Sequence, residues 1–175
     1  MPHALSAIIG LNVAPYGATV IVAVCANGRS DEFGGVMVAE TSRYGVGMTV
    51  ALDFERAVER IKQALAAEGF GILCEIDVAA TMKKKLDVDF RPYVILGACN
   101  PPLAYQALTA ERDIGLLLPC NIIVYADDSP GHSVIAAMDP VVALGVTGNT
   151  ALQPLAEEVK TRLIRALDAL DATTL

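Results

Sequence analysis

The spacing of apolar residues changes from strand-like to helix-like soon after residue 44. Between Gly45 and Leu52 every second residue is large and apolar, which predicts a β-strand with one buried face. From Asp53 to Gly69 the apolar residues recur three and four positions apart, which predicts an amphipathic helix. Asp53 is suited to begin this helix as its N-cap, and Gly69 is suited to end it.

The chain from Phe70 to Leu170 predicts four further strands and three further helices. The last two strands flank a turn rich in Asp, Ser, Pro and Gly and therefore form a hairpin. The resulting order, β-α-β-(α)-β-α-β-β-α, predicts an α+β fold: a two-layer sandwich with a mostly antiparallel sheet. The strands are Phe70–Val78, Tyr93–Cys99, Asn121–Ala126 and Ser133–Met138, and the helices are Ala79–Leu86, Pro101–Ala110 and Leu152–Leu170.

The first forty residues differ from the rest in character. Two apolar stretches, Ala7–Val13 and Ala18–Ala26, are separated by a turn at Pro15–Gly17. Because this turn interrupts them and no Lys or Arg precedes them, we expect neither a transmembrane span nor a signal peptide. We therefore expect an N-terminal extension over residues 1–40 and a single α+β domain over residues 41–175.

Composition narrows the classes of function. The chain has 175 residues and a formal net charge of −7. A nucleic-acid-binding domain normally carries a basic surface, so we do not expect this protein to bind nucleic acid. The one basic run, Lys83–Lys85, is interpreted as the solvated face of a helix. The four cysteines include no CxxC pair, so neither a zinc site of that type nor a disulfide scaffold is expected. A reducing cytoplasm is the simplest compartment.

Two Cys-Asn pairs beside prolines are the sharpest candidates for chemistry. Cys99 ends a predicted strand, Asn100 is a favoured helix N-cap, and Pro101 is favoured at the first helical position. A thiol at a helix N-terminus is expected to have a lowered pKa, which would make Cys99 a nucleophile or a metal ligand. The alternative is a small apolar residue that packs at the end of a strand.

The second pair gains its interest from the first. If the strands that hold Cys99 and Cys120 are neighbours, both sulfurs lie at one edge of the sheet and form a dithiol or a pair of soft metal ligands. Asn100 and Asn121 either cap and tie loops or donate hydrogen bonds to a ligand. The sequence leaves open whether the two cysteines are close enough for a disulfide.

Other residues are weaker candidates. Glu75 and Asp77 share one face of a predicted strand, where two carboxylates suit acid–base catalysis, binding of a hard cation, or simply an exposed polar face. Cys74 alternates with Ile72 and Ile76 and is expected in the core. His132 follows the hairpin turn and is expected at the surface.

Several segments together resemble a known family. They include Phe54–Ile61, the Leu96-Gly-Ala-Cys-Asn-Pro101 run and the Leu117-Leu-Pro-Cys-Asn-Ile-Ile-Val-Tyr125 run. In this order they resemble the domain of unknown function 302 family over about residues 44–170. The resemblance implies a small α+β fold, commonly a dimer, without an established activity. The cysteine-bearing loops indicate one branch of that family, because many relatives have Gly-Asn-Pro and Leu-Pro there.

A homodimer is expected on separate grounds. The strands Tyr93–Cys99 and Asn121–Tyr125 are apolar on both faces, and helices cover only one face of a two-layer sandwich. A second copy would cover the other face. If the protein is only a structural or interaction module whose sheet face serves to dimerise, we expect it to tolerate Cys99→Ser but not polar substitutions at Ile122 or Val124.

These observations support one main hypothesis and two alternatives. The main one is a cytoplasmic dimer that binds a small ligand or a soft metal ion near Cys99 and Cys120, without nucleic-acid or membrane partners. The first alternative is a thiol–disulfide redox enzyme in which Cys99 attacks and Cys120 resolves. The second is a structural or interaction module without a ligand. No cofactor is evident, because nucleotide-binding, zinc-protease and hydrolase motifs are absent from the sequence.

Overall fold

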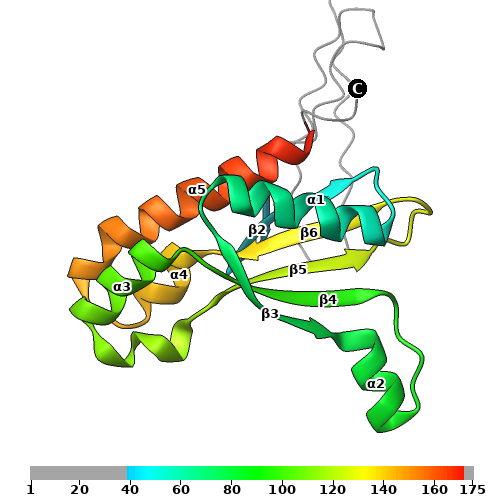
Figure 1. Cartoon of the computed structure of the whole chain (residues 1–175), viewed down its shortest axis with the longest axis horizontal. Helices are drawn as coiled ribbons and strands as arrows, with labels where there is room; N and C mark the ends of the chain where they lie inside the picture. The colour runs from blue at the N-terminus through cyan, green and yellow to red at the C-terminus, as the bar shows by residue number, and fades with distance from the viewer. Residues whose placement is uncertain (1–38, 172–175) are drawn as a thin grey trace, which may run out of the picture. The chain divides into compact units, whose positions relative to one another are not determined.

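A computed structural model describes residues 39–171 of the chain, and these residues form one antiparallel sheet with helices (Figure 1). The sheet has six strands in the order β1-β2-β6-β5-β4-β3, and every neighbouring pair is antiparallel. The strands are β1 (Ala39–Ser42), β2 (Gly45–Val50), β3 (Gly71–Asp77), β4 (Tyr93–Cys99), β5 (Cys120–Ala126) and β6 (Ser133–Met138).

Two long helices, α1 (Phe54–Ala67) and α5 (Gln153–Asp171), lie together on one face of the sheet (Figure 1). This arrangement confirms the predicted two-layer α+β fold and its antiparallel sheet. The remaining helices are α2 (Val78–Leu86), α3 (Pro101–Ala110) and α4 (Pro140–Gly145), with 3-10 segments η1 (Arg112–Leu117) and η2 (Thr150–Leu152).

Helix α4 was not predicted, although the sequence carries its signal. Asp139 caps it by accepting a hydrogen bond from the backbone N–H of Val141 at 2.9 Å, and Pro140 occupies the first helical position. Helix α3 begins in a similar way, with Asn100 as its N-cap and Pro101 at its first position. The six residues of α4 are too few to give a helical period, which explains why the periodicity did not predict it.

The hydrophobic core lies between the sheet and helices α1 and α5. Alternate residues of the four inner strands point into it, and Leu96, Ile122, Val124 and Ile135 are fully buried there. The helices contribute the apolar stripes that their sequences predict, as the central positions Ala57, Ile61, Leu65, Leu163, Ala166 and Leu167 illustrate.

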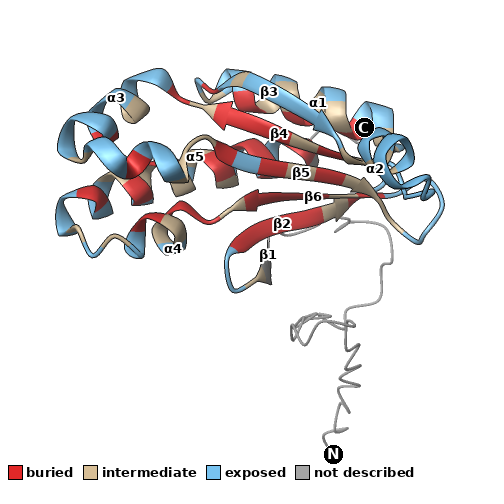
Figure 2. Cartoon of the chain, turned by 90° about the horizontal axis from the view of Figure 1, so that it is seen from below, coloured by how far each residue is buried: buried red, intermediate tan, exposed pale blue. Residues whose placement is uncertain are grey.

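The opposite face of the sheet is lined by apolar side chains that no described helix covers. Figure 2 shows this face in front, with α1 and α5 behind it. Tyr93, Ile95, Ile123 and Tyr125 point to this side, because their strand neighbours point into the core. Their side chains are partly buried by one another, and the rings of Tyr93 and Tyr125 stack with centroids 5.4 Å apart.

The expected positions of the dimer-forming residues need correction. Ile122 and Val124 are fully buried beneath the helices and so do not belong to the open face. The strand period of two places their neighbours Ile123 and Tyr125 on that face instead.

The expected core position of Cys74 is wrong, because its side chain is exposed. A β-bulge between Ile72 and Cys74 shifts the register of β3 against β4, so that Ile72 packs on the core while Cys74 lies opposite Gly97. The regular alternation that the sequence suggests is broken at this bulge. Cys74 therefore belongs to the open face of the sheet.

Parts of the sequence interpretation lie outside the described residues. The apolar stretches before residue 27, most of the expected extension over residues 1–40, and Cys25 fall in this category. In the part of the chain from residue 39 to residue 171, no helix is both long enough and apolar enough to cross a membrane.

Candidate functional site

Cys99 and Cys120 lie on neighbouring strands at the same edge of the sheet. Strands β4 and β5 pair directly, with Ala98 opposite Cys120, and Cys99 is the residue after Ala98. Both cysteines are free thiols. The condition that the sequence left open, namely that the two strands are neighbours, is therefore met.

Both cysteines line a small cavity beneath α3. Its volume is about 30 Å³, and Met138 at the end of β6 also lines it. The rest of the lining is apolar apart from Asn100 and includes Phe70, Leu103, Leu118, Leu144 and Val159. Three residues that carry sulfur thus line one apolar space.

The two thiols are held in their protonated forms. Burial raises the pKa of the Cys99 thiol, which is the opposite of the lowering expected at a helix N-terminus. Burial also raises the pKa of Cys120 to about 11, and the nearby charge of the Cys99 thiolate adds to this effect. At neutral pH neither side chain is a ready nucleophile.

The start of α3 offers no free backbone donor to a thiolate at Cys99. Pro101 and Pro102 have no N–H to offer an anion. The N–H of Leu103 donates to Oδ1 of Asn100 at 3.4 Å, and the N–H of Ala104 donates to the carbonyl oxygen of Asn100 at 2.9 Å. The donors that normally attract an anion at a helix N-terminus are therefore absent or already used.

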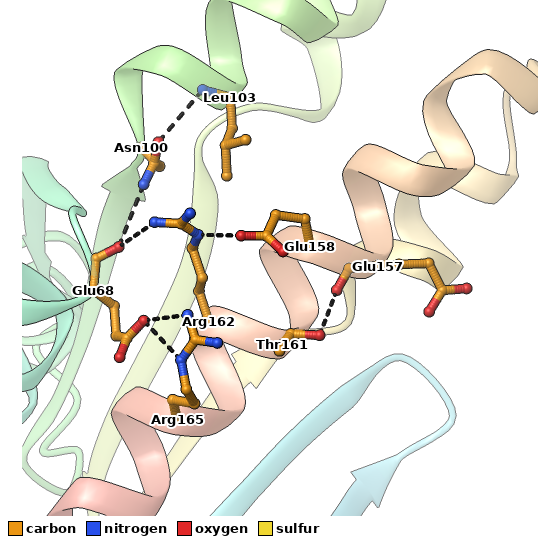
Figure 3. Close-up of polar contacts among 8 residues, drawn as sticks. All are labelled: Glu68, Asn100, Leu103, Glu157, Glu158, Thr161, Arg162 and Arg165. Carbon is orange, nitrogen blue, oxygen red and sulfur yellow. Dashed lines mark hydrogen bonds and ion pairs between the residues drawn. The ribbon is translucent and has the colours of Figure 1, made fainter.

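Asn100 has a clear structural role at this edge of the sheet. It is buried, with 7% of its surface exposed, and its Nδ2 donates to the carbonyl oxygen of Glu68 at 3.4 Å (Figure 3). Arg162 of α5 donates from Nη1 to the same carbonyl oxygen at 3.3 Å. Asn100 therefore links the start of α3 to the end of α1, which matches the expectation that it caps and ties loops.

Ionic contacts surround this link. Arg165 donates from Nε and Nη2 to one carboxylate oxygen of Glu68, at 3.0 and 2.7 Å, and Arg162 donates from Nε to Glu158 at 2.7 Å (Figure 3). The hydrogen bond from Arg165 lowers the pKa of Glu68, against the opposing effect of desolvation. The contacts of Arg165 with Glu68 join α5 to the end of α1, whereas the Arg162–Glu158 pair lies within α5.

The other candidate residues lie apart from the cavity lining. Asn121 is exposed, opposite Gly97 on the open face. Glu75 forms an ion pair with Lys62, and Asp77 accepts a hydrogen bond from the N–H of Ala80 as the N-cap of α2. The two carboxylates thus each have a structural partner.

Two surface expectations can be compared with the described structure. His132 is exposed, and its Nδ1 lies 3.0 Å from the carbonyl oxygen of Pro130. Lys83, Lys84 and Lys85 are exposed on the last turn of α2, where Lys83 pairs with Asp87 and Asp89. Both the surface histidine and the solvated basic face are confirmed.

Met138 is the residue of this site that sequence reasoning missed. A lone methionine at the end of an apolar strand reads as a core residue. The available signal was positional: Met138 immediately precedes Asp139-Pro140, just as Cys99 precedes Asn100-Pro101. Within residues 39–171, no group of three or more His, Cys, Asp or Glu side chains is arranged to hold a metal ion.

Comparisons with known proteins agree with this fold. Residues 46–170 match the family described as domain of unknown function DUF302. The crystal structure of an uncharacterized conserved protein DUF302 from Bacillus stearothermophilus is similar to this chain, with a TM-score of 0.67 and 30% sequence identity. The similarity covers 73% of this chain and 98% of that chain. No curated protein matches. The chain therefore belongs to the DUF302 family.

Proposed function

We propose that this protein binds a soft metal ion through Cys99 and Cys120. The observation that carries the proposal is that both cysteines, which come from neighbouring strands, are among the residues that line the same apolar cavity. Thiolates are the ligands that soft ions prefer, and an apolar lining keeps competing water away from them. A reducing compartment such as the cytoplasm would keep both thiols available.

The size of the cavity favours an ion over an organic ligand. Pockets for drug-sized molecules measure about 300–1,000 Å³, whereas this cavity measures about 30 Å³. A space of about 10–15 Å³ already holds a water molecule. A single ion therefore matches this volume better than an organic ligand does. The loss of free N–H donors at the start of α3 also removes the support for a small anionic ligand.

The redox alternative has less support from the thiols themselves. A dithiol enzyme needs an accessible thiolate as the attacking group. Burial raises the pKa of both Cys99 and Cys120, and the side chain of Cys120 is only 8% exposed. Metal binding places a weaker demand on the free thiols, because the ion itself displaces the protons.

The experiment is anaerobic equilibrium dialysis against Cu(I), Cd(II) and Zn(II), with metal content measured by mass spectrometry. A background variant with Cys25→Ser and Cys74→Ser leaves only the two proposed ligands. We expect this background variant to retain one soft ion per chain. The same variant with Cys99→Ser and Cys120→Ser added should retain none. Retention of no ion by the background variant, or equal retention by both proteins, would contradict the proposal.

We also propose that the protein forms a homodimer through the open face of the sheet. That face carries a contiguous apolar surface around Ile95 and Ile123, beyond the scattered apolar residues of an ordinary monomer surface. Helix α2 has no buried residue and extends away from the helical layer on this side (Figure 1). Exposed apolar side chains lie on α2 or on the segments before and after it, namely Leu73, Ile76, Leu86, Val88 and Phe90.

Analytical ultracentrifugation tests the dimer. We expect the wild-type chain to sediment as a dimer and Ile123→Glu to sediment as a folded monomer. Leu116→Glu is the matched control, because Leu116 is 88% exposed and lies on η1, outside the strands that form this face. A monomeric wild-type chain, or a dimer that Ile123→Glu leaves intact, would contradict the proposed interface.

A further inference from the structure

We propose that the bound ion is Cu(I) and that the thioether of Met138 is its third ligand. This inference rests on the metal site proposed for Cys99 and Cys120. It assigns a definite ion to that site and adds a third ligand, Met138, whose side chain does not titrate.

The topology of the sheet brings the three sulfur-bearing residues together. Cys99 is the last residue of β4, Cys120 is the first residue of β5, and Met138 is the last residue of β6. Because β4, β5 and β6 are antiparallel neighbours, the end of β4, the start of β5 and the end of β6 lie at one edge of the sheet. All three residues line the cavity at that edge.

The mixture of donors distinguishes Cu(I) from harder ions. Thiolate and thioether sulfurs together favour Cu(I), whereas Zn(II) in structural sites takes four Cys, His or carboxylate ligands in a tetrahedron. The residues that line the cavity supply two thiols and one thioether, and no His, Asp or Glu is among them. The donor set therefore falls short of a zinc site but satisfies a three-coordinate soft ion.

Binding is a ligand exchange without electron transfer. Cu⁺ forms two bonds to the thiolates of Cys99 and Cys120 and one to the thioether of Met138. The two thiol protons pass to solvent, and copper stays in the +1 state throughout. The sulfur of Met138 releases no proton, so it contributes affinity without adding to the proton cost of binding.

The test compares Met138→Leu with Met48→Leu in the background that lacks Cys25 and Cys74. Leucine preserves apolar volume at both positions. Met48 is the matched control, because it is buried in the core with 4% of its surface exposed. Anaerobic competition with a chromogenic Cu(I) chelator measures affinity, and X-ray absorption at the copper edge counts the sulfur ligands. Far-UV circular dichroism checks that both variants fold.

We expect Met138→Leu to weaken Cu(I) binding at least about tenfold and to reduce the sulfur count from three to two. Met48→Leu should change neither. If Met138→Leu and the background protein have equal Cu(I) affinity and sulfur count, Met138 is not the third ligand. Binding that still depends on the two cysteines would in that case support the metal site itself. Cysteine-dependent retention of Cd(II) or Zn(II) in preference to Cu(I) would overturn the copper assignment alone. Absence of any retained ion would overturn the metal site itself.

Discussion

Asn100 donates a hydrogen bond through Nδ2 to the carbonyl oxygen of Glu68, 32 residues earlier in the chain. The same side chain caps α3 through its Oδ1, so one buried amide joins the end of α1 to the start of α3. This contact places Cys99, the residue before Asn100, at the cavity below α3. The asparagine of the first Cys-Asn pair thus positions the site.

Asn100→Ala should lower the free energy of unfolding by about 1–2 kcal/mol, because it removes a helix cap and leaves the Glu68 carbonyl with one donor fewer. Asn100→Asp should lower the free energy of unfolding by less than Asn100→Ala. Aspartate keeps the oxygen that caps α3 and loses only the hydrogen bond from Nδ2 to Glu68. Urea denaturation measures both. Asp53→Ala, at the exposed N-cap of α1, is the control for loss of a cap alone. A loss at Asn100→Ala no larger than at Asp53→Ala would argue against the link to Glu68.

Gly97→Ala should destabilise the fold by about 1–3 kcal/mol through overpacking. A Cβ atom there would lie 2.6 Å from Sγ of Cys74 and 2.7 Å from Cγ of Pro119. Adding Cys74→Ala should recover part of the loss by removing one of these two clashes. Gly71→Ala, in the neighbouring strand and with no atom within 4 Å of its added Cβ, should be close to neutral. Thermal unfolding of the four proteins provides the comparison.

Lys160→Met should destabilise the protein by about 1–3 kcal/mol, because it leaves a buried carboxylate without its cation. Lys160 Nζ lies 2.6 Å from Oδ2 of Asp139, which is 5% exposed. Lys62→Met removes the lysine of an exposed ion pair with Glu75. It should lower the free energy of unfolding by less than about 1 kcal/mol, because exposed ion pairs usually contribute no more than that. Similar losses for the two variants in chemical denaturation would contradict this ranking.

The ion pair between Glu68 and Arg165 should make stability depend on pH on the acidic side. The hydrogen bond from Arg165 lowers the pKa of Glu68 in the folded state below its ordinary value of 4.5. The stabilisation is therefore fully present above that ordinary value and disappears as the pH falls through the lower folded pKa.

Arg165→Met should raise the pKa of Glu68 towards its ordinary value, which NMR titration of the carboxyl carbon measures directly. The stability difference between the variant and the wild type should be present at neutral pH and vanish in acid. A pKa of Glu68 that Arg165→Met does not change would show that another group sets it.

Alkylation by iodoacetamide at neutral pH should modify Cys74 first, Cys99 more slowly and Cys120 last. Cys74 is exposed, Cys99 is partly buried, and burial raises the pKa of Cys120 to about 11. Because the thiolate is the reactive form, raising the pH from 7 to 9 should speed modification of Cys99 without exposing Cys120. Mass spectrometry of peptides gives the rate at each site. Faster modification of Cys99 than of Cys74 would instead support the redox enzyme.

The local sequence determined most of the secondary structure. The alternation in β2, the apolar stripes of α1 and α5 and the Asn-Pro start of α3 each depend on neighbouring residues, so their signals are complete within a short segment. The order of these elements was sufficient for the α+β class. Cys99 and Asn100 were also recognised from their place between a strand and a helix.

Which side chains meet depends on packing between segments that are distant in the sequence. The sequence pattern predicts Cys74 in the core, but the bulge in β3 places it on the open face. Side chains alternate along β5, so Ile123, and not Ile122, lies on that face. Met138 joined the two cysteines because three antiparallel strands end at one edge, a relationship between segments nearly forty residues apart that no local pattern contains. The direction of the thiol pKa shifts likewise followed from burial, since burial results from packing between segments that are distant in the sequence.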